Sequence, residues 1–371
     1  MDKIKVLHYA PGFKEGGIES RMVDWYEKIN REKYQFVLLK CNSDNKSSKL
    51  IRLKQLGCKV YNNPPFSIKT VIPFVLGIKK VLLREKPDVV HVHNPFTGYF
   101  VLKEAKKAGV PIRILHSRTT DFLPNEKNVP IKKALRLLSP KYATHYFACS
   151  IEAGLWGIGK KYKRKIKVIN NGINIDNFKY SKTIRDEIRK KYNISSDTFV
   201  VGTIGRLSPQ KNLTKLVEVF YEINKCNNNS LLFIVGEGSD KKKLVKKLES
   251  MNLLSKTILA GSKSDVYNYY MAFDCFVSTS HYEGFGTTAI EAQATGLPTF
   301  LSLAFPKTVM ITNYITRIPL CESNSKWAKT ILDYKHRFRT EYDTIAIDQA
   351  GFSSDSIAKE LEEYYSGRKK A

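Results

Sequence analysis

The chain has 371 residues, of which 42% are apolar and 26% charged, a composition typical of a soluble globular protein with room for two domains. No apolar run approaches the roughly 20 residues that span a bilayer, and the first apolar run is only strand-length, so we expect neither a membrane-spanning helix nor a signal peptide. The formal net charge of +27 leaves nucleic acid, an anionic membrane or a polyanionic substrate as possible partners, beside a lysine-rich composition without function.

The first half of the chain alternates short apolar runs with helical segments. A buried strand at 4–10 leads through a glycine loop to a helix that starts near Ser20, and further strands are expected at 34–41, 88–93, 112–117, 145–150 and 167–173. Strands that alternate with helices predict a parallel, doubly wound sheet.

The same alternation starts again in the second half. Strands are expected at 199–206, 231–238, 256–261, 275–280 and 298–302, with helices between them that include 212–225 and 241–250. We therefore predict an α/β protein of two tandem Rossmann-like domains, 1–178 and 179–350, whose parallel sheets face a central cleft. The last segment, 351–371, is expected to return to the first domain as a helix. Open α/β sheets bind ligands at the carboxyl ends of their strands, so one domain could hold a donor and the other an acceptor.

The segment TIGRLSPQKN, from Thr203, combines a strand end with two cations. Arg206 and Lys211 stand close to a helix start that Asn212 could cap. A guanidinium fork, a point charge and free backbone amides would suit a diphosphate. The alternative is two solvated cations at a surface turn.

The segment HYEGFGTTAIEAQATGLP, from His281, holds two carboxylates around a glycine turn. Gly284 and Gly286 let the backbone pass close to a ligand, and the amides from Phe285 to Thr288 would form an anion site. Glu283 precedes this site and Glu291 follows it inside the helix. The two carboxylates could grip opposite ends of one elongated ligand, or they could be a loop residue and a helix-surface residue without function.

These motifs resemble the GT-B retaining glycosyltransferases of family 4. Glu283 and Glu291 match the Glu-x7-Glu motif of that family, and GRLSPQKN is similar to its basic diphosphate motif. HYAPGFKEGGIESRM resembles its N-terminal glycine loop. VINNGINIDNF resembles its interdomain segment, although Asn174 replaces the usual aspartate. The resemblance covers nearly the whole chain and is strongest to bacterial capsule and exopolysaccharide transferases, which mostly use UDP-sugars.

The resemblance implies a role for each matching residue. Glu283 would hold the hydroxyls of the donor sugar, Glu291 the nucleotide ribose, and Arg206 with Lys211 the diphosphate. Further donor contacts are implied for Gly16, Gly17, Gly236, Lys263, Gly284, Phe285, Gly286, Thr287 and Thr288. His93 would lie near the reacting sugar, which makes it a catalytic candidate together with Glu283, Arg206 and Lys211.

The strand-end histidines need a separate interpretation. His93 closes the strand DVVHVH and opens into Asn94, and His116 closes the next strand two residues before Arg118. We place Asn94, His116 and Arg118 on the acceptor side. His91 is expected on the opposite face of its strand from His93, and we interpret it, like His145, as structural.

The expected reaction moves a hexose or N-acetylhexosamine from a UDP-sugar to an acceptor hydroxyl with retained anomeric configuration. No DxD pair follows a strand, so we expect no metal and no other cofactor, with cations and helix amides meeting the charge of the departing diphosphate. Retention could proceed through a carboxylate nucleophile or through internal return, in which the leaving diphosphate takes the acceptor's proton. The resemblance favours internal return.

Basic residues interleave with apolar ones at helical spacing from Ile131 to Leu138. Such a helix could lie on an anionic membrane surface, and the acceptor would then be lipid-linked, through a polyprenyl carrier, at the cytoplasmic face of the cell membrane. The alternative is a buried helix with a solvated face. The six cysteines show no CxxC spacing, which indicates a reducing compartment.

Other functional classes remain as alternatives. A nucleic-acid-binding protein would use the same charge, but no helix-turn-helix, RRM or zinc-finger pattern occurs, so we expect no nucleic-acid partner. A nicotinamide oxidoreductase would need the absent GxGxxG. A basic membrane-binding protein or a sugar-binding module without turnover is a further possibility. The oligomeric state stays undecided.

Overall fold

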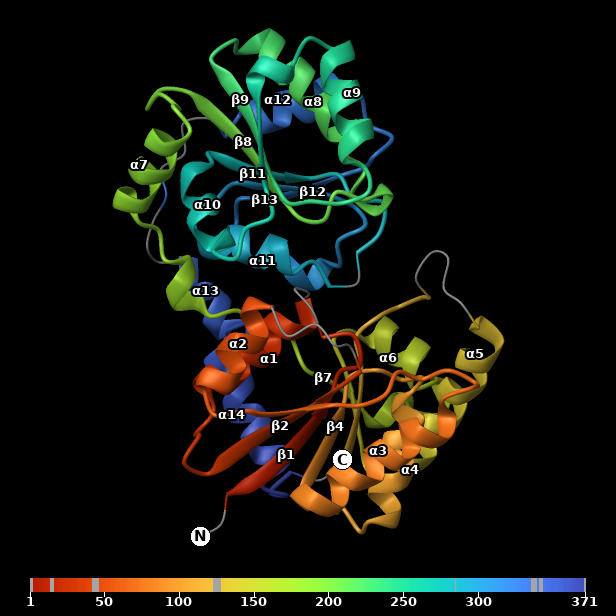
Figure 1. Cartoon of the computed structure of the whole chain (residues 1–371). Helices are drawn as coiled ribbons and strands as arrows, with labels where there is room; N and C mark the ends of the chain where they lie inside the picture. Colours follow the sequence, from red (N-terminus) through yellow and green to blue (C-terminus); the bar gives the residue numbers. More distant parts are fainter. Residues whose placement is uncertain are drawn as a thin grey trace. The chain divides into compact units, whose positions relative to one another are not determined.

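The computed structural model describes residues 3–13, 17–41, 47–122, 128–283, 285–334, 339 and 343–369. The chain forms two α/β units, one comprising Met1–Gly172 with Ser353–Ala371 and the other Ile173–Phe352. Each unit is built around one parallel sheet (Figure 1), which confirms the predicted α/β class. The first unit passes into the second between residues 172 and 173, whereas the predicted domains were 1–178 and 179–350.

The N-terminal unit holds a seven-stranded sheet in the order β3-β2-β1-β4-β5-β6-β7. Its strands are β1 (Ile4–Tyr9), β2 (Tyr34–Lys40), β3 (Lys59–Asn62), β4 (Val89–Val92), β5 (Ile112–Ser117), β6 (His145–Ala148) and β7 (Ile166–Val168). The order reverses between β1 and β4, which pair in parallel with His8 opposite His91. In a doubly wound fold this switch point is where ligands bind.

Helices cover both faces of this sheet. They are α1 (Gly17–Lys28), α2 (Ser48–Gln55), α3 (Val71–Glu85), α4 (Gly98–Lys107), α5 (Val129–Leu138), α6 (Ile151–Gly157) and α14 (Ser354–Tyr365), with 3₁₀ turns η1 (Ser139–Tyr142) and η2 (Lys160–Lys165). One core cluster joins α1, α2 and α14 to the sheet, and a second joins α3 and α4 to the other face.

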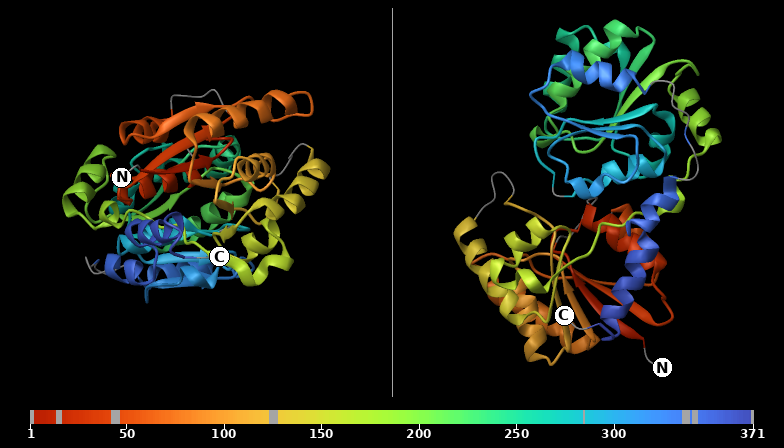
Figure 2. Two further views of the ribbon diagram at one scale, coloured as in Figure 1. Left: turned by 90° about the horizontal axis from the view of Figure 1, so that it is seen from below. Right: turned by 180° about the vertical axis from the view of Figure 1, so that it is seen from behind.

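The C-terminal helix α14 belongs to the first unit and packs against α1, as the views from two sides agree (Figures 1 and 2). Its apolar residues Ile357, Ala358 and Leu361 join the same core as Trp25 of α1. The side chain of Tyr365 reaches the sheet, where its hydroxyl lies 2.8 Å from His91 Nδ1. The last helix therefore contributes directly to the interior beneath the switch point.

The second unit holds a six-stranded sheet in the order β10-β9-β8-β11-β12-β13. The strands are β8 (Phe199–Ile204), β9 (Ser230–Val235), β10 (Thr257–Gly261), β11 (Cys275–Ser278), β12 (Thr299–Ser302) and β13 (Ile315–Ile318). The helices are α7 (Lys182–Lys191), α8 (Leu213–Cys226), α9 (Lys241–Ser250), α10 (Val266–Ala272), α11 (Thr287–Ala294), α12 (Asn324–Leu332) and α13 (Asp343–Gln349). The 3₁₀ turns are η3 (Ile175–Phe178), η4 (Pro209–Lys211), η5 (Leu254–Lys256) and η6 (Lys307–Val309). The switch point of this sheet lies between β8 and β11.

Most strands were predicted within two residues at each end, although β9 ends three residues and β7 five residues before the predicted end. Two strands were missed. Both β3 and β13 are four-residue strands at the edges of their sheets, and neither residue run is uniformly buried. Helix α1 begins at Gly17, three residues before the predicted start at Ser20.

Candidate functional site

Two loops at the switch point of the second unit bring the predicted donor residues together. Arg206 follows β8, Lys211 closes η4, and Glu283 follows β11. The Lys211 Nζ donates to Glu283 Oε1 at 2.7 Å, and the hydroxyl of Ser280 donates to the same oxygen at 2.7 Å. Because β8 and β11 are neighbours in the sheet, residues distant in sequence meet at one edge.

The two loops are tied together by their backbones. The amide of His281 donates to the carbonyl of Gln210 at 2.8 Å, and the Gln210 side chain returns to the carbonyl of Tyr282 at 2.9 Å. Asn212 has left-handed backbone geometry and makes no capping bond with its side chain, so the expected Asn212 cap is wrong. Instead Thr279 holds the start of α8, because its hydroxyl donates to the Asn212 carbonyl.

Arg206 differs from Lys211 in being exposed. Among the described residues it has no ion-pair partner, although it lines one small hollow together with Lys211, Ser278 and Thr279. One cation is therefore held by a carboxylate while the other is free to meet an anion.

Position 236, next to Gly205 of this hollow, requires glycine for a steric reason. A Cβ on Gly236 would stand 1.9 Å from the carbonyl oxygen of Gly205, so the loops after β8 and β9 can cross only if this residue lacks a side chain. Lys263, after β10, stacks its ammonium over the Tyr269 ring at 5.9 Å. Both residues thus have structural contacts, and their implied contacts with the donor stay predictions.

The glycine turn before α11 sets the start of that helix. Gly286 has a φ of +87°, and a Cβ there would meet the Phe305 ring at 2.5 Å, so both conformation and space require glycine. Phe285 is buried and packs against Phe352. The first N–H groups of α11, from Thr287 and Thr288, have no acceptor within the helix. Gly284 and Gly16 lie outside the described residues, and Gly17 is the first residue of α1.

Glu291 lies on α11 with only 8% of its surface exposed. The hydroxyl of Tyr270 donates to its Oε2 at 2.9 Å. Burial, and then the nearby carboxylate, raises the pKa of Tyr270 well above its ordinary value, so the hydroxyl stays a donor. Glu291 is therefore held in one orientation from its buried side.

The N-terminal unit carries a separate cavity of about 570 Å³. His93, Asn94 and Arg118 line it, so three of the residues predicted near the reacting sugar or acceptor are brought together. His116 is fully buried and does not line the cavity, so its expected contact with an acceptor is not available in this structure. Asn94 uses its side-chain oxygen to accept the amides of Phe96 and Thr97 at 3.0 Å, which holds the turn before α4.

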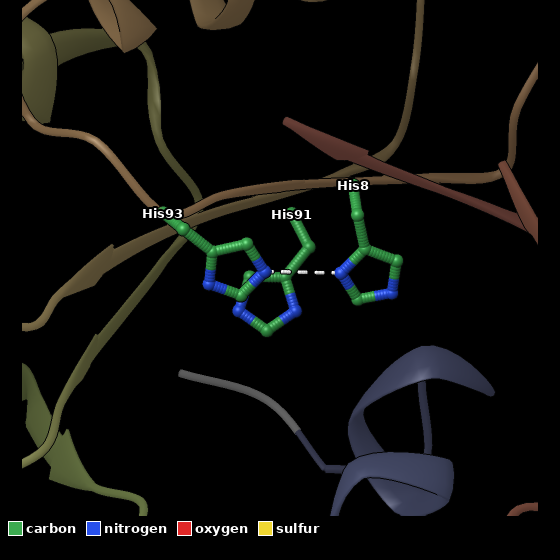
Figure 3. A group of neighbouring side chains, drawn as sticks. All are labelled: His8, His91 and His93. Atoms are coloured by element: carbon green, nitrogen blue, oxygen red, sulfur yellow. Dashed lines mark hydrogen bonds between the residues drawn. The ribbon is translucent and has the colours of Figure 1, made fainter. Parts of the chain in front are cut away.

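Four histidines gather behind this cavity, three of which are drawn in Figure 3. His8 Nδ1 lies 3.0 Å from His93 Nε2, and His91 Nε2 lies 3.0 Å from His116 Nδ1. The expectation that His91 and His93 face opposite sides is wrong, because residues two apart in a strand share a face and the two rings are 4.3 Å apart. Trp25 of α1 covers the group.

Known proteins resemble the chain over both units. The model for glycosyl transferases group 1 matches residues 184–336, and the model for glycosyltransferase family 4 matches residues 15–177. The chain belongs to the family 4 glycosyltransferases of the GT-B fold.

Individual relatives of this chain are named as glycosyltransferases, and one of them is named for a lipid-linked sugar acceptor. EpsF of Bacillus subtilis (strain 168) is 28% identical over 333 residues, covering 88% of this chain and 86% of EpsF. The Escherichia coli UDP-Gal:alpha-D-GlcNAc-diphosphoundecaprenol alpha-1,3-galactosyltransferase is 31% identical over 235 residues, 62% of this chain and 61% of that protein. Anabaena HepE, crystallised with UDP and glucose, has a TM-score of 0.78 at 20% identity and covers 98% of this chain and 99% of its own, which supports the fold.

Sequence reasoning missed His8, which is part of the histidine group behind the cavity. Arg118 Nε donates to His93 Nδ1 at 3.3 Å, and a guanidinium can only donate. His93 must then carry its proton on Nε2 and donate to His8 Nδ1. The signal available in the sequence was the histidine near the end of the first strand, which a doubly wound sheet puts beside the strand of His91 and His93.

The same proton assignment bears on metal binding. Ligand atoms of His8, His91 and His93 lie within 4.8 Å of one another. Ligation through His93 Nε2 would move its proton to Nδ1, where it would oppose the Arg118 N–H. Both His91 nitrogens already have partners, Tyr365 and His116. The donor set therefore fits a hydrogen-bonded network better than a metal site.

Burial keeps this network neutral. It lowers the pKa of His8 to about 3 and lowers the pKa of His91, His93 and His116 well below the ordinary value, with Arg118 adding to the effect in each case. Burial also lowers the pKa of Arg118 to about 10, which still leaves the guanidinium charged at neutral pH.

Proposed function

We propose that this glycosyltransferase moves a hexose or N-acetylhexosamine from a UDP-sugar to a polyprenyl-linked glycan, with retention, in the synthesis of a surface polysaccharide. The observation that carries the proposal is the arrangement at the second switch point. There, an exposed guanidinium, an ion-paired lysine and a carboxylate stand together at a sheet edge.

Similar proteins support UDP as the nucleotide and a lipid carrier on the acceptor. Solved structures of HepE contain UDP or UDP-glucose, and the Escherichia coli relative is named for a UDP-linked galactose and a diphosphoundecaprenol acceptor. Two Staphylococcus aureus relatives are named for capsular polysaccharide biosynthesis. We propose the same chemical classes of donor and acceptor here.

Each donor-site residue receives a proposed role from its surroundings. Arg206 and Lys211 meet the diphosphate, with the first amides of α11 as further donors. Glu283 accepts from the sugar hydroxyls and Glu291 from the ribose. In this scheme an arriving diphosphate competes with Glu283 for Lys211, so donor binding would release the carboxylate toward the sugar.

The proposed chemistry breaks the bond between the anomeric carbon and the β-phosphate oxygen. The acceptor oxygen attacks from the same face, and its proton passes to the departing phosphate oxygen. Charge on the diphosphate is met by cations and amides in place of a metal. Glu283 acts in this scheme by accepting from the sugar hydroxyls, while the Ser280 hydroxyl, which donates to its Oε1, stays its partner within the chain.

The reaction class is tested by donor screening. The shift in melting temperature is measured with UDP, GDP and ADP and with their hexose and N-acetylhexosamine forms, and UDP release is then followed with a polyprenyl-diphosphate-linked sugar. Stabilisation by uridine compounds, acceptor-dependent UDP release and full activity in EDTA are expected. Binding of sugar without any turnover would indicate a sugar-binding module instead.

Replacing Glu283 by Gln tests the sugar contact. The amide keeps the shape but loses the charge, and hydrogen bonds to a charged group contribute about 1.5–3 kcal/mol. We expect kcat/KM to fall by roughly 10–150-fold, with UDP affinity unchanged within about threefold. The exposed Glu322→Gln is the matched control. A fall no greater than the control's would remove Glu283 from the site.

Membrane attachment is proposed through two helices of the first unit. No described helix has the length and apolar content needed to cross a bilayer. Helix α5 exposes Leu137 at 67%, and α3 exposes Ile72 at 71% and Leu76 at 57%. Exposed cations, including Lys80, accompany these apolar residues, and each Lys or Arg near an anionic surface contributes about 1 kcal/mol.

Liposome sedimentation tests this attachment. The wild type should pellet with anionic vesicles and stay in solution with neutral ones at low salt. The double variant Ile72→Ser/Leu76→Ser should lose at least about half of the pelleted fraction, because the apolar part of the contact is removed. Leu254→Ser, which alters an exposed leucine of the second unit, should not. Equal pelleting of all three proteins would reject α3 as a contact.

A further inference from the structure

The cavity of the N-terminal unit is formed by the loops that follow β1 to β5. Its volume of about 570 Å³ lies within the roughly 300–1,000 Å³ of small-molecule sites. The lining residues that the structure describes all belong to the first unit. It lies at the carboxyl edge of a doubly wound sheet, where ligands of such folds bind.

Most of the lining is apolar and aromatic. Phe96 and Phe122 stack with ring centroids 5.3 Å apart, and Phe66 lines the cavity from the loop after β3. Tyr9 lies fully buried beneath this lining, with its hydroxyl donating to Thr97 at 2.8 Å. An apolar and aromatic lining of this kind suits the hydrocarbon part of a ligand.

One polar group in the lining lacks a partner. Arg118 donates through Nε to His93 and through Nη1 to Asn171. Its guanidinium carbon lies 4.8 Å from the centroid of the Trp25 ring. Its Nη2 is buried and has no hydrogen-bond acceptor in the described part of the chain. A buried donor without an acceptor is unfavourable, and a bound anionic oxygen would supply the missing acceptor.

The charged lining favours an anion. Among the described residues of the lining, Arg118 and Lys132 are cations and Asp121 is the one acidic side chain. Guanidinium groups bind phosphate oxygens in a bidentate manner. The fixed contacts to His93 and Asn171 hold the guanidinium in place before the ligand arrives, which lowers the entropic cost of binding.

We propose that this cavity binds the diphosphate and the first isoprene units of the lipid-linked acceptor, with Arg118 as the anion anchor and the Phe96–Phe122 wall as the hydrocarbon surface. The inference rests on the proposed function for the identity of the lipid. The chemistry itself is that of an apolar chain joined to a phosphate.

Calorimetric titration of the full chain with farnesyl diphosphate tests the proposal without any transfer reaction. Saturating UDP is present, so that the donor site cannot hold the probe. Farnesyl diphosphate should bind at least about tenfold more tightly than either farnesol or inorganic diphosphate, because each of these lacks one half of the recognised chemistry. Equal affinity for inorganic diphosphate would indicate an anion site only, and equal affinity for farnesol an apolar cavity only, and either would overturn the proposal.

Two variants separate the halves of the site. Arg118→Gln should weaken farnesyl diphosphate about 10–150-fold and leave farnesol unchanged, whereas Phe122→Ser should weaken both ligands. Arg164→Gln, at an exposed arginine of the same unit, is the charge control and should change neither. If Arg118→Gln does not fold, the wild-type comparison of the three ligands still decides.

The UDP titration made beforehand distinguishes this inference from the proposed function. UDP binding without tighter binding of farnesyl diphosphate would reject the cavity assignment and leave the donor site standing. If UDP does not bind, the farnesyl diphosphate titration is repeated with Arg206→Ala. Tight binding of farnesyl diphosphate by that variant would support the cavity assignment and reject UDP as part of the donor.

Discussion

Arg206→Ala is expected to lower turnover at least about a hundredfold while the fold survives. The guanidinium is exposed and makes no ion pair in the described part of the chain, so its removal leaves no buried group without a partner. A preorganised group that meets charge in the transition state contributes about 3–4 kcal/mol, or 10²–10³ in rate. An ordinary surface charge contributes only about 0–1 kcal/mol.

The measurement is kcat with a saturating UDP-sugar, alongside the unfolding midpoint. Arg206→Lys should recover part of the rate, because a point charge replaces the fork. Lys242→Ala, at an exposed lysine of α9, should keep wild-type turnover. A loss below about tenfold in Arg206→Ala would argue that the leaving diphosphate is met elsewhere.

Acid should destabilise the N-terminal unit strongly, and this is the second large effect. The folded state keeps four histidines neutral, since burial lowers the pKa of His8 to about 3 and of the other three well below the ordinary value. In the unfolded chain a histidine has a pKa near 6.5. The unfolded state therefore binds more protons below pH 6.5, and stability falls as the pH falls.

The expected size follows from proton linkage. Each histidine that stays neutral in the folded state lowers the free energy of unfolding by about 1.4 kcal/mol per pH unit below 6.5. The four together lower it by roughly 5 kcal/mol between pH 7.5 and 5.5. His145 is also buried, and burial lowers its pKa, so it acts in the same direction. The loss continues until the folded-state pKa is reached, near 3 for His8.

Chemical unfolding followed by tryptophan fluorescence at the two pH values gives the free energies. In His116→Asn the difference between them should shrink by about 1.4 kcal/mol, since one proton-binding group is removed and the amide can still bond to His91. The exposed His281→Asn is the control and should leave the difference as in wild type. The same difference in all three proteins would mean that His116 is protonated in the folded state.

Much of the fold could be predicted from sequence because its central strands are long and buried. Runs such as IKVLHY and FVVGTI are buried for most or all of their length, so composition alone identifies them. The edge strands KVYN and ITRI carry mixed exposure and gave no such signal. Helix α9 matched its predicted bounds of 241–250, because its basic residues alternate with apolar ones at helical spacing.

The sequence predicted which residues form the candidate site better than it predicted the contacts between them. The sequence indicated a cation cluster and two carboxylates, and the structure joins Lys211 to Glu283, a pair that depends on the adjacency of β8 and β11. The link from Arg118 through His93 to His8 depends likewise on register between three strands. Spacing along one chain carries no information on such contacts across a sheet.

A crystal structure of the full chain with UDP tests the central claim most directly. We predict that the diphosphate lies within hydrogen-bond distance of Arg206 and Lys211, with the ribose hydroxyls on Glu291 and with Lys211 drawn away from Glu283. UDP bound in another part of the chain, with the Lys211–Glu283 ion pair intact and neither cation touching phosphate, would contradict the account.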